Sequence, residues 1–399
     1  MSIQGIFMSN QGIVGERTGD FANAILMINP TGTAPLLALT SGMGKAGAND
    51  TIFNWFEDAH QSGRATVVSG GTTTTVVVDD GSIYVPGTVL MVEDSGEFLL
   101  VTSVTGNSLT VVRGIGGTSI VAVDGTDFVQ NVGNAHEESS DMPTAVTQQG
   151  APRSNYTQIF RNAWAISGTA TAVTFRTGSK LAHNKRFCAI YHAEDMERAF
   201  IWSRKHIGVL NGKQFRMTDG LNAQIESYGG TVDAAATGSS AGDLSRKDLE
   251  EFIRKVFAKN VKGQPNERIA FCGDMVLQVI NNMTWLDGVN QFNMEETKIG
   301  IKVTKVLTPF GVLNLMTHPL MNENPVWQHE LYVYHPGGIR RRVLRDTFEN
   351  NYDKDGNRIE GVDADQGVMT TEVGIECAAA QTMGIMTNIQ EAVASYPAP

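Results

Sequence analysis

Charged residues are scarce in this chain of 399 residues, since Asp, Glu, Lys and Arg together make up only 18% of it. Acidic residues outnumber basic ones, which gives a formal net charge of −11. An acidic surface repels phosphate, so this balance argues against tight binding of nucleic acid regardless of its base sequence. Few charges and 42 glycines suit either a surface that neighbouring subunits cover or a plain β-rich globular protein. The length allows two or three domains, each with its own core.

Cysteine and long apolar runs are also scarce. The three cysteines, Cys188, Cys272 and Cys377, stand apart with no CxxC pair, which fits three small buried side chains in a reducing compartment better than a metal or redox site. The first residues lack a basic start followed by an apolar run, so we expect no signal peptide. No window approaches ~18 uninterrupted apolar residues, so we expect no transmembrane helix and no membrane partner.

Catalytic motifs are nearly absent. The chain has no HExxH, no GxxxxGK[ST] and no GxGxxG after a strand. Gly238–Gly242 matches GxSxG around Ser240, but that motif requires a strand before the serine, and the Ala-rich stretch ahead of it is a poor strand. Asp353–Asn357 resembles a calcium loop, yet its glycine is misplaced and Ala364 stands where a bidentate acid is needed. We therefore expect no enzyme activity, cofactor or metal, and interpret these segments as a linker and an exposed turn.

A β-rich stretch from Val67 to Val132 is the most informative part of the chain. Short runs of Val, Thr, Ile and Leu alternate there with turn signals such as Asp79–Gly81, Asp94–Gly96 and Thr105–Asn107. This pattern predicts a small antiparallel barrel or sandwich. Alternation along the runs predicts its core as the following residues: Val76, Val78, Leu90, Val92, Leu99, Val101, Leu109 and Val111.

The stretch interrupts a region of different composition, as an inserted module would. Residues 50–60 before it and 156–175 after it are predicted to be the rising and returning strands of a long hairpin that carries the module at its tip. If Ser69 to Asn131 is self-contained, its two ends must lie close together. A projecting hairpin with such a tip is typical of surfaces that assemble.

The remainder mixes helices and strands without regular alternation. The first 40 residues predict an extended arm with a short helix near Leu36–Leu39, and Gly42–Gly47 is predicted to be a flexible joint. An apolar stripe predicts a long helix over Lys185–Ile207 with Met196 and Phe200 buried. A second helix begins at Ser245, where Asp248 completes a capping box, and a third covers Met275–Asn282.

After Lys298 the pattern returns to strands, which favours an α+β fold over a doubly wound sheet. The only dense basic run is Arg340–Arg342 with Arg345. Alternate arginines on a strand face opposite sides, so pairing with acidic residues, within the chain or at a subunit contact, is favoured over DNA contact. The predicted strands are as follows: Ile299–Leu307, Val312–Met316, Val326–Tyr334, Ile339–Leu344 and Met369–Ala378.

This order of elements resembles that of the HK97-fold major capsid proteins of tailed bacteriophages, in particular a subgroup with a β-rich insertion in the E-loop. The resemblance spans nearly the whole chain, and the order of the elements carries it. The long helix stands where the family has its spine helix, and Gln366–Ile389 is similar to its terminal P-domain strand. The motifs that contribute are Thr18–Phe21, Phe53–Asp58, the Gly87–Arg113 module, Asn155–Phe160 and Gly212–Leu221.

The resemblance implies a division of the chain into named parts. These are an N-terminal arm (1–41), an ascending E-loop (42–66), the inserted β module (67–132), an E-loop return (133–176), a P-domain with the spine helix (177–220), an A-domain (221–330) and a P-domain return (331–399). No long charged helical segment precedes the arm, so neither a fused scaffolding domain nor proteolytic maturation is expected.

The implied function is structural. Copies would form hexamers and pentamers of an icosahedral head around double-stranded DNA, held non-specifically, with cement, scaffolding and portal proteins as further partners. Virions would contain the protein, and assembly would occur in the host cytoplasm. A long hairpin cannot bury its apolar groups alone, so we predict these inter-subunit contacts: Phe53, Trp55, Phe56, Ile159, Phe160, Trp164, Arg340 and Arg342.

Two alternatives stay open at this point. A bacterial shell resembling the encapsulins would share the fold but would load proteins in place of DNA. A serine hydrolase with Ser240 as nucleophile belongs to a different class and is the least favoured.

Overall fold

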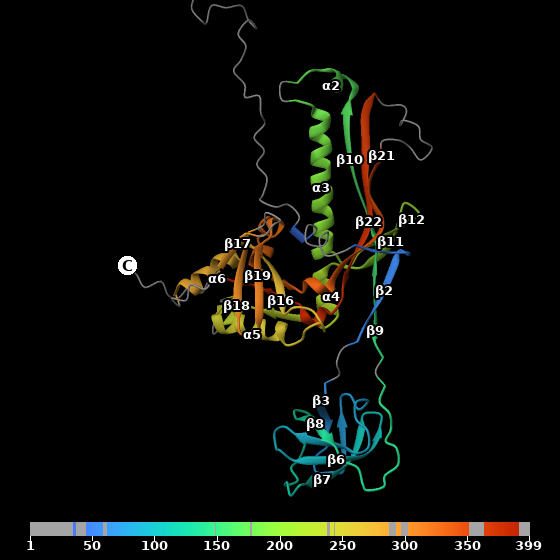
Figure 1. Cartoon of the computed structure of the whole chain (residues 1–399), viewed down its shortest axis with the longest axis vertical. Coiled ribbons are helices and arrows are strands. Elements are labelled where there is room, and N and C mark those ends of the chain that lie inside the picture. Colours follow the sequence, from blue (N-terminus) through green and yellow to red (C-terminus); the bar gives the residue numbers. More distant parts are fainter. Residues whose placement is uncertain are drawn as a thin grey trace, which may run out of the picture. The chain divides into compact units, whose positions relative to one another are not determined.

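The structure is a computed structural model that describes residues 35–36, 45–58, 62–147, 149–175, 178–237, 240–242, 244–286, 293–296, 302–350 and 363–390. The chain forms two compact units, which we call the barrel unit (Phe56–Arg153) and the body (Met1–Trp55 with Ser154–Pro399). Both are labelled by element in Figure 1. The calcium-like turn Asp353–Asn357 lies outside the described residues.

The barrel unit contains a closed antiparallel barrel with strand order β3-β4-β7-β6-β5-β8. All eight residues predicted as its core are 0–2% exposed, so the prediction of a small inserted β barrel is confirmed. Gly106, with φ of +61°, lies in the left-handed region that the two-residue turn after β6 requires. The strand bounds are β3 Arg64–Ser69, β4 Thr75–Val78, β5 Thr88–Val92, β6 Phe98–Thr105, β7 Ser108–Ile115 and β8 Phe128–Asn134.

The ends of the barrel lie side by side, as an insertion requires. Strands β3 and β8 are antiparallel neighbours that pair Thr66 with Phe128. Beyond them, the Asn131 backbone N–H donates to the Gly63 carbonyl at 2.8 Å. The chain therefore enters and leaves the barrel at the same place. The ends of the module lie close together as predicted, but the entry is at Gly63 and not at the predicted Ser69, which is the last residue of β3.

The stem of the hairpin is a two-stranded sheet of β2 (Ile52–Glu57) and β9 (Ala151–Tyr156). The prediction that residues 156–175 form the returning strand is wrong. The next strand, β10 (Gln158–Ser167), leaves the stem and pairs along its whole length with β22 (Ala364–Cys377) of the body.

The four-stranded sheet of the body has the order β1-β21-β22-β10, with β1 (Lys45–Gly47) parallel to β21 (Ile339–Asn350). The predicted flexible joint thus ends in a strand. Helix α3 (Lys180–Trp202) runs along this sheet beside β10 (Figure 1). Short helix α2 (Gly168–Ala172) joins β10 to it.

Helix α3 buries the two residues predicted to be buried, since Met196 is 7% and Phe200 0% exposed. Ile207, at the predicted end of the helix, instead lies in strand β11 (His206–Leu210) and is 39% exposed. The ring of Phe200 meets Phe160 of β10 edge to face at 6.3 Å. The predicted bounds are shifted, however. The helix starts at Lys180, where the Ser179 hydroxyl caps it, and it ends at Trp202 because Ser203 is extended with ψ of 158°.

Two predicted strands are shorter than expected. Residues Trp327–His329 form a 3-10 turn (η1), so the strand predicted from Val326 is only β20 (Leu331–Tyr334). The predicted terminal strand Gln366–Ile389 divides between two sheets, because Ala379 is left-handed with φ of +60° and starts a turn before β23 (Gly384–Thr387).

The second sheet of the body has seven strands in the order β13-β23-β20-β16-β19-β18-β17. Helix α5 (Arg246–Phe257) packs on it and begins with the predicted capping box of Ser245 and Asp248. The remaining elements are β13 Thr231–Ala234, β14 Ala236–Thr237, β15 Ser240–Ala241, β16 Glu267–Cys272, β17 Asn293–Glu296, β18 Lys302–Thr308, β19 Gly311–Thr317, α4 Leu221–Ser227, α6 Asp274–Leu286, α7 Pro319–Asn322, η2 Pro336–Gly338 and η3 Ala380–Thr382.

A two-stranded hairpin of β11 (His206–Leu210) and β12 (Lys213–Met217) belongs to neither large sheet. Its turn residues Asn211 and Gly212 have φ of +51° and +71°, as a tight hairpin turn requires. The three cysteines are buried, as predicted, and none of them forms a disulfide. Among the residues that the structure describes, no helix is long and apolar enough to span a membrane.

Candidate assembly surfaces

The predicted contact residues of the stem fall on two faces. Phe53 and Trp55 point inward, are each 7% exposed, and stack with ring centroids 6.1 Å apart. Trp55 also meets Tyr228 of the body edge to face at 6.2 Å. Phe56, the next residue along β2, faces the opposite way and is 78% exposed. Because its aromatic ring is so exposed to solvent, Phe56 is the strongest candidate in the stem for contact with another molecule.

The same division occurs on β10. Phe160 and Trp164 are each 6% exposed, whereas Ile159, on the opposite face of the strand, is 46% exposed. Trp164 donates from Nε1 to Glu349 Oε1 at 3.0 Å, and the Lys185 ammonium lies 4.4 Å from its ring centroid. Four of the six predicted apolar contact residues are therefore covered within their own chain, and Phe56 and Ile159 retain surface for a neighbour.

The arginine run on β21 is met by carboxylates on β22. Arg342 forms an ion pair with the buried Glu376, and Arg345 one with Glu372 at 2.7 Å. Arg216 reaches Glu372 from β12 at 3.5 Å. The side chain of Arg340 is exposed. These pairs agree with the expectation of pairing with acidic residues, and Arg340 and Arg345 are the exposed members of the run.

A buried polar junction, which the sequence did not signal, fixes the base of the stem. Asn155 is fully buried, and its amide Nδ2 donates to the carbonyls of Ile375 at 2.7 Å and Asp219 at 3.0 Å. Its Oδ1 accepts from the Asp219 backbone N–H at 2.8 Å. The Gln224 amide Nε2 donates to the same two carbonyls, and its Oε1 accepts from the Cys377 backbone N–H at 3.1 Å. Because a buried amide without partners costs stability, this junction locks β9 to β22 and helix α4.

Burial perturbs the charges beside that junction. Burial raises the pKa of Asp219, although the Lys205 N–H and ammonium group oppose the rise. Burial likewise lowers the pKa of Lys205, whose ammonium donates to the Ser154 carbonyl at 2.7 Å. The pair holds the start of the β11–β12 hairpin close to the stem.

Residues 35–36 are anchored through a buried carboxylate. Glu197 of helix α3 accepts from the Leu36 backbone N–H at 2.7 Å and contacts His318 Nε2 at 2.9 Å. All three residues are 0% exposed. The short apolar run of the arm was predicted as a helix, and residues 35–36 are helical. The polar anchor could not be predicted, because its members are far apart in the sequence.

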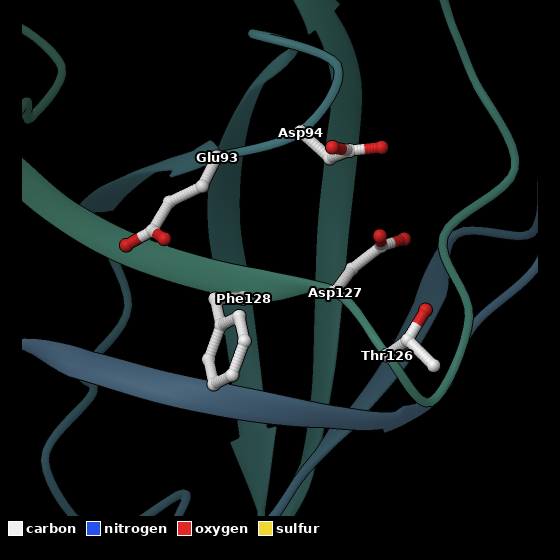
Figure 2. Close-up of a pocket in the computed structure, with 5 residues that line it drawn as sticks. All are labelled: Glu93, Asp94, Thr126, Asp127 and Phe128. Carbon is white, nitrogen blue, oxygen red and sulfur yellow. The ribbon is translucent and has the colours of Figure 1, made fainter. Parts of the chain in front are cut away.

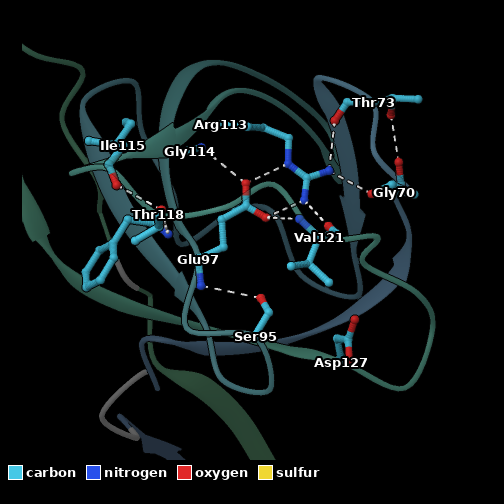
Figure 3. A network of polar contacts seen from close by, with 12 residues as sticks. Gly70, Thr73, Ser95, Glu97, Arg113, Gly114, Ile115, Thr118, Val121 and Asp127 are labelled. Carbon is cyan, nitrogen blue, oxygen red and sulfur yellow. Dashed lines mark hydrogen bonds and ion pairs between the residues drawn. The ribbon is translucent and has the colours of Figure 1, made fainter.

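An ion pair lies inside one end of the barrel (Figure 3). Arg113 donates to Glu97 Oε2 at 2.6 Å and Oε1 at 3.0 Å, and it also reaches the carbonyls of Gly71 and Val121. Burial acts to raise the pKa of Glu97, but hydrogen bonds from Arg113 and the Val121 N–H outweigh it and the pKa is lowered. The pair ties the loop after β7 to the barrel wall.

A pocket of about 340 Å³ opens on the barrel and is lined by acids (Figure 2). Glu93, Asp94 and Asp127 line it with Phe128, whose ring lies 3.6 Å from the Arg64 guanidinium. Arg64 also pairs with Glu93 at 2.6 Å. Within the described part of the chain, no three His, Cys, Asp or Glu residues come together as a metal site would require.

A model of the family described as SU10 major capsid protein matches residues 7–390. The chain belongs to the SU10 major capsid protein family. The major capsid protein of Pseudomonas phage PaMx41 is 27% identical to it over 388 residues, which is 93% of this chain and 92% of that protein.

Solved structures from two phages share the fold of this family member. A chain from Mycobacterium phage Cain is 8% identical, and the match covers 98% of this chain and all of that one with a TM-score of 0.52. A chain from Mycobacterium phage Bobi is 9% identical, with coverage of 96% and 99% and a TM-score of 0.50. The predicted α+β, HK97-like capsid fold is confirmed.

Family membership also decides between the functional classes. The protein is a phage major capsid protein with a structural role, and it is not an enzyme. The hydrolase alternative based on Ser240 is therefore wrong. The encapsulin alternative is the weaker one, because the matching family is that of phage capsids.

Proposed function

We propose that copies of this chain form hexamers and pentamers that close an icosahedral head around double-stranded DNA. The observation that carries the proposal is the family match over residues 7–390. The exposed apolar residues of the stem support it, since Phe56 is 78% and Ile159 46% exposed in the single chain. A subunit that leaves such groups open gains stability when a neighbour covers them.

The named parts of the chain belong to the same proposal. We assign 1–41 to the N-terminal arm, 42–66 and 133–176 to the E-loop with 67–132 as its inserted module, 177–220 and 331–399 to the P-domain, and 221–330 to the A-domain. Phe56, Ile159 and Arg340 are the inter-subunit contacts with exposed side chains. Phe53, Trp55, Phe160, Trp164 and Arg342 support those contacts from inside the subunit.

Packaged DNA is contacted without regard to sequence in this proposal. A chain with net charge −11 and 18% charged residues does not bind phosphate tightly, which lets DNA move along the wall during packing. Cement, scaffolding and portal proteins are further proposed partners, and assembly takes place in the host cytoplasm. Particles purified from infected cells should contain DNA; particles with protein cargo and no DNA would favour the encapsulin alternative.

The direct test compares assembly of the purified chain with that of Phe56→Ser. The wild-type chain should form closed or sheet-like particles in negative-stain micrographs, whereas Phe56→Ser should keep its circular dichroism spectrum and assemble poorly. Phe56→Leu is the matched control and should assemble, because it retains apolar area. A wild-type chain that stays a 43.1 kDa monomer in light scattering at all salt and protein concentrations would contradict the proposal.

A further inference from the structure

Three neighbouring strands of the barrel present an apolar face to the outside. The register pairs β5 with β6 and β6 with β7, and residues directly opposite each other share one face of a sheet. Leu90 and Leu99 of these strands point into the core at 0% exposure, so the residues on either side of them point outward. We call the outward set the outer patch: Val89, Leu100 and Val112 in one row, and Met91, Phe98 and Ile115 in the next.

The outer patch is only partly covered by the chain. Val112 is 49% exposed and the other five residues are half-buried. Single exposed apolar residues are ordinary, but six in two adjoining rows form a continuous surface of the kind that marks a binding site. A barrel whose outer wall met only water would carry polar residues at these positions.

The charge around the outer patch restricts the partner. Residues 62–134 contain seven Asp or Glu, two Arg and no Lys. Both arginines are held in ion pairs, Arg64 with Glu93 and Arg113 with Glu97, each at 2.6 Å. Glu93 and Asp94 follow directly on β5, at the Met91 end of the patch, and line the acidic pocket (Figure 2). Two such barrels would repel each other, so the partner must combine apolar groups with positive charge.

The β11–β12 hairpin of the body has that combination. The hairpin, residues 206–217, contains Lys213 and Arg216 and no Asp or Glu. Arg216 reaches Glu372 at 3.5 Å, whereas Lys213 is exposed to solvent. Val209 and Leu210 at its tip are 72% and 64% exposed, and Lys213 lies directly opposite Leu210. A two-stranded hairpin with exposed apolar residues is marginally stable in water and gains from being covered.

We propose that the outer patch of one copy receives the tip of the β11–β12 hairpin of a second copy, with Lys213 against the acidic rim. The proposal rests on the self-assembly of capsid subunits. A contact between two different surfaces of identical chains is head-to-tail, and it closes into a ring when the rotation between copies allows it. The contact adds an inter-subunit bond to those of the stem.

Engineered cysteines test the contact. The three native cysteines are buried, so they contribute little background. Leu210→Cys combined with Val112→Cys should give disulfide-linked oligomers on a non-reducing gel after assembly and mild oxidation. The matched control replaces Val112→Cys by Val68→Cys, because Val68 is similarly exposed at 57% but lies on β3, which is not part of the patch. Linked oligomers in the control at equal yield, or cross-links within one chain only, would overturn the proposal.

A charge exchange provides an independent test. Lys213→Glu and Asp94→Lys should each lower the yield of particles at low salt, and the double variant should restore it. Both side chains are exposed, so neither change should unfold the subunit, and circular dichroism checks this. Particles that form equally well in all four chains and show no selective cross-link would refute the hairpin contact while leaving capsid assembly itself supported.

Discussion

The barrel unit and the body bury their side chains by different means. Each strand of the barrel pairs with strands inside residues 64–134, and its core is a set of aliphatic residues with Tyr84. The body closes only when segments far apart in the sequence meet, as Asn155 does with Ile375, 220 residues away, and Leu36 with Glu197, 161 residues away. The barrel thus has the character of an independent insertion, and the body depends on long-range polar junctions as well as on apolar packing.

The largest expected effect lies in the body. Phe200→Ala removes a fully buried ring from helix α3 and should cost ~3–5 kcal/mol in the free energy of unfolding of the body. Hydrogen exchange measured by mass spectrometry should show faster exchange in body peptides and unchanged exchange in barrel peptides. Tyr191→Ala, on the same helix at 53% exposure, is the control and should change little. Equal loss of protection in both units would mean that they do not unfold separately.

The corresponding change in the barrel breaks its buried ion pair. Glu97→Ala leaves Arg113 buried without its carboxylate, and breaking such a pair should cost ~3–5 kcal/mol in the barrel's free energy of unfolding. Glu93→Ala removes a pair of similar geometry at the surface and should have little effect, since solvent screens it. Barrel peptides report the result in hydrogen exchange; equal effects of the two changes would show that burial does not matter here.

Acid should destabilise the body at a higher pH than the barrel. Burial and the nearby Arg268 lower the pKa of His335 in the body to about 4, whereas an unfolded histidine titrates near ~6.5. The unfolded body therefore takes up a proton first, so this contribution to stability is present above ~6.5 and is lost as the pH falls toward 4. The closed barrel, within residues 62–134, contains no histidine. The pKa of Glu97 is lowered in the folded barrel, so its contribution to barrel stability is lost only when the pH falls below ~4.3, the ordinary pKa of Glu.

His335→Asn is the control for that pH dependence. Removal of the imidazole ring should make the body's melting temperature fall less between pH 6.5 and 4. The melting temperature of the barrel should change neither with pH in this range nor with the substitution. An unchanged slope would assign the acid sensitivity to other groups.

The smallest expected effect concerns helix α5. Ser245→Ala removes the hydroxyl that accepts from the Asp248 N–H at 3.2 Å and should cost ~1 kcal/mol in the body's free energy of unfolding. Ser245→Asp keeps an acceptor at the cap and should restore most of it. Thermal melting monitored by circular dichroism measures both.

Local patterns were enough to predict the barrel and the helices. Strict alternation placed all eight core residues of the barrel, and the capping box fixed the start of α5. The return strand of the stem was predicted too late in the sequence. Tyr156 ends β9, which pairs with β2, and Gln158 begins β10, which pairs with β22, so only these distant partners separate the two strands. Phe53 and Phe56 could not be told apart as buried and exposed before the pairing of β2 was known. Glu197 and His318 are ordinary polar residues until the fold brings them together.

The most direct test of two separable units in one capsid subunit is to replace residues 64–130 by a short Gly-Ser linker and measure the melting of what remains. Gly63 and Asn131 lie side by side, so the linker spans their gap without strain. We predict that the shortened chain melts cooperatively within a few degrees of the body in the full-length chain, while the particles that it forms are less stable. A shortened chain without a folded circular dichroism spectrum or a cooperative transition would contradict the account.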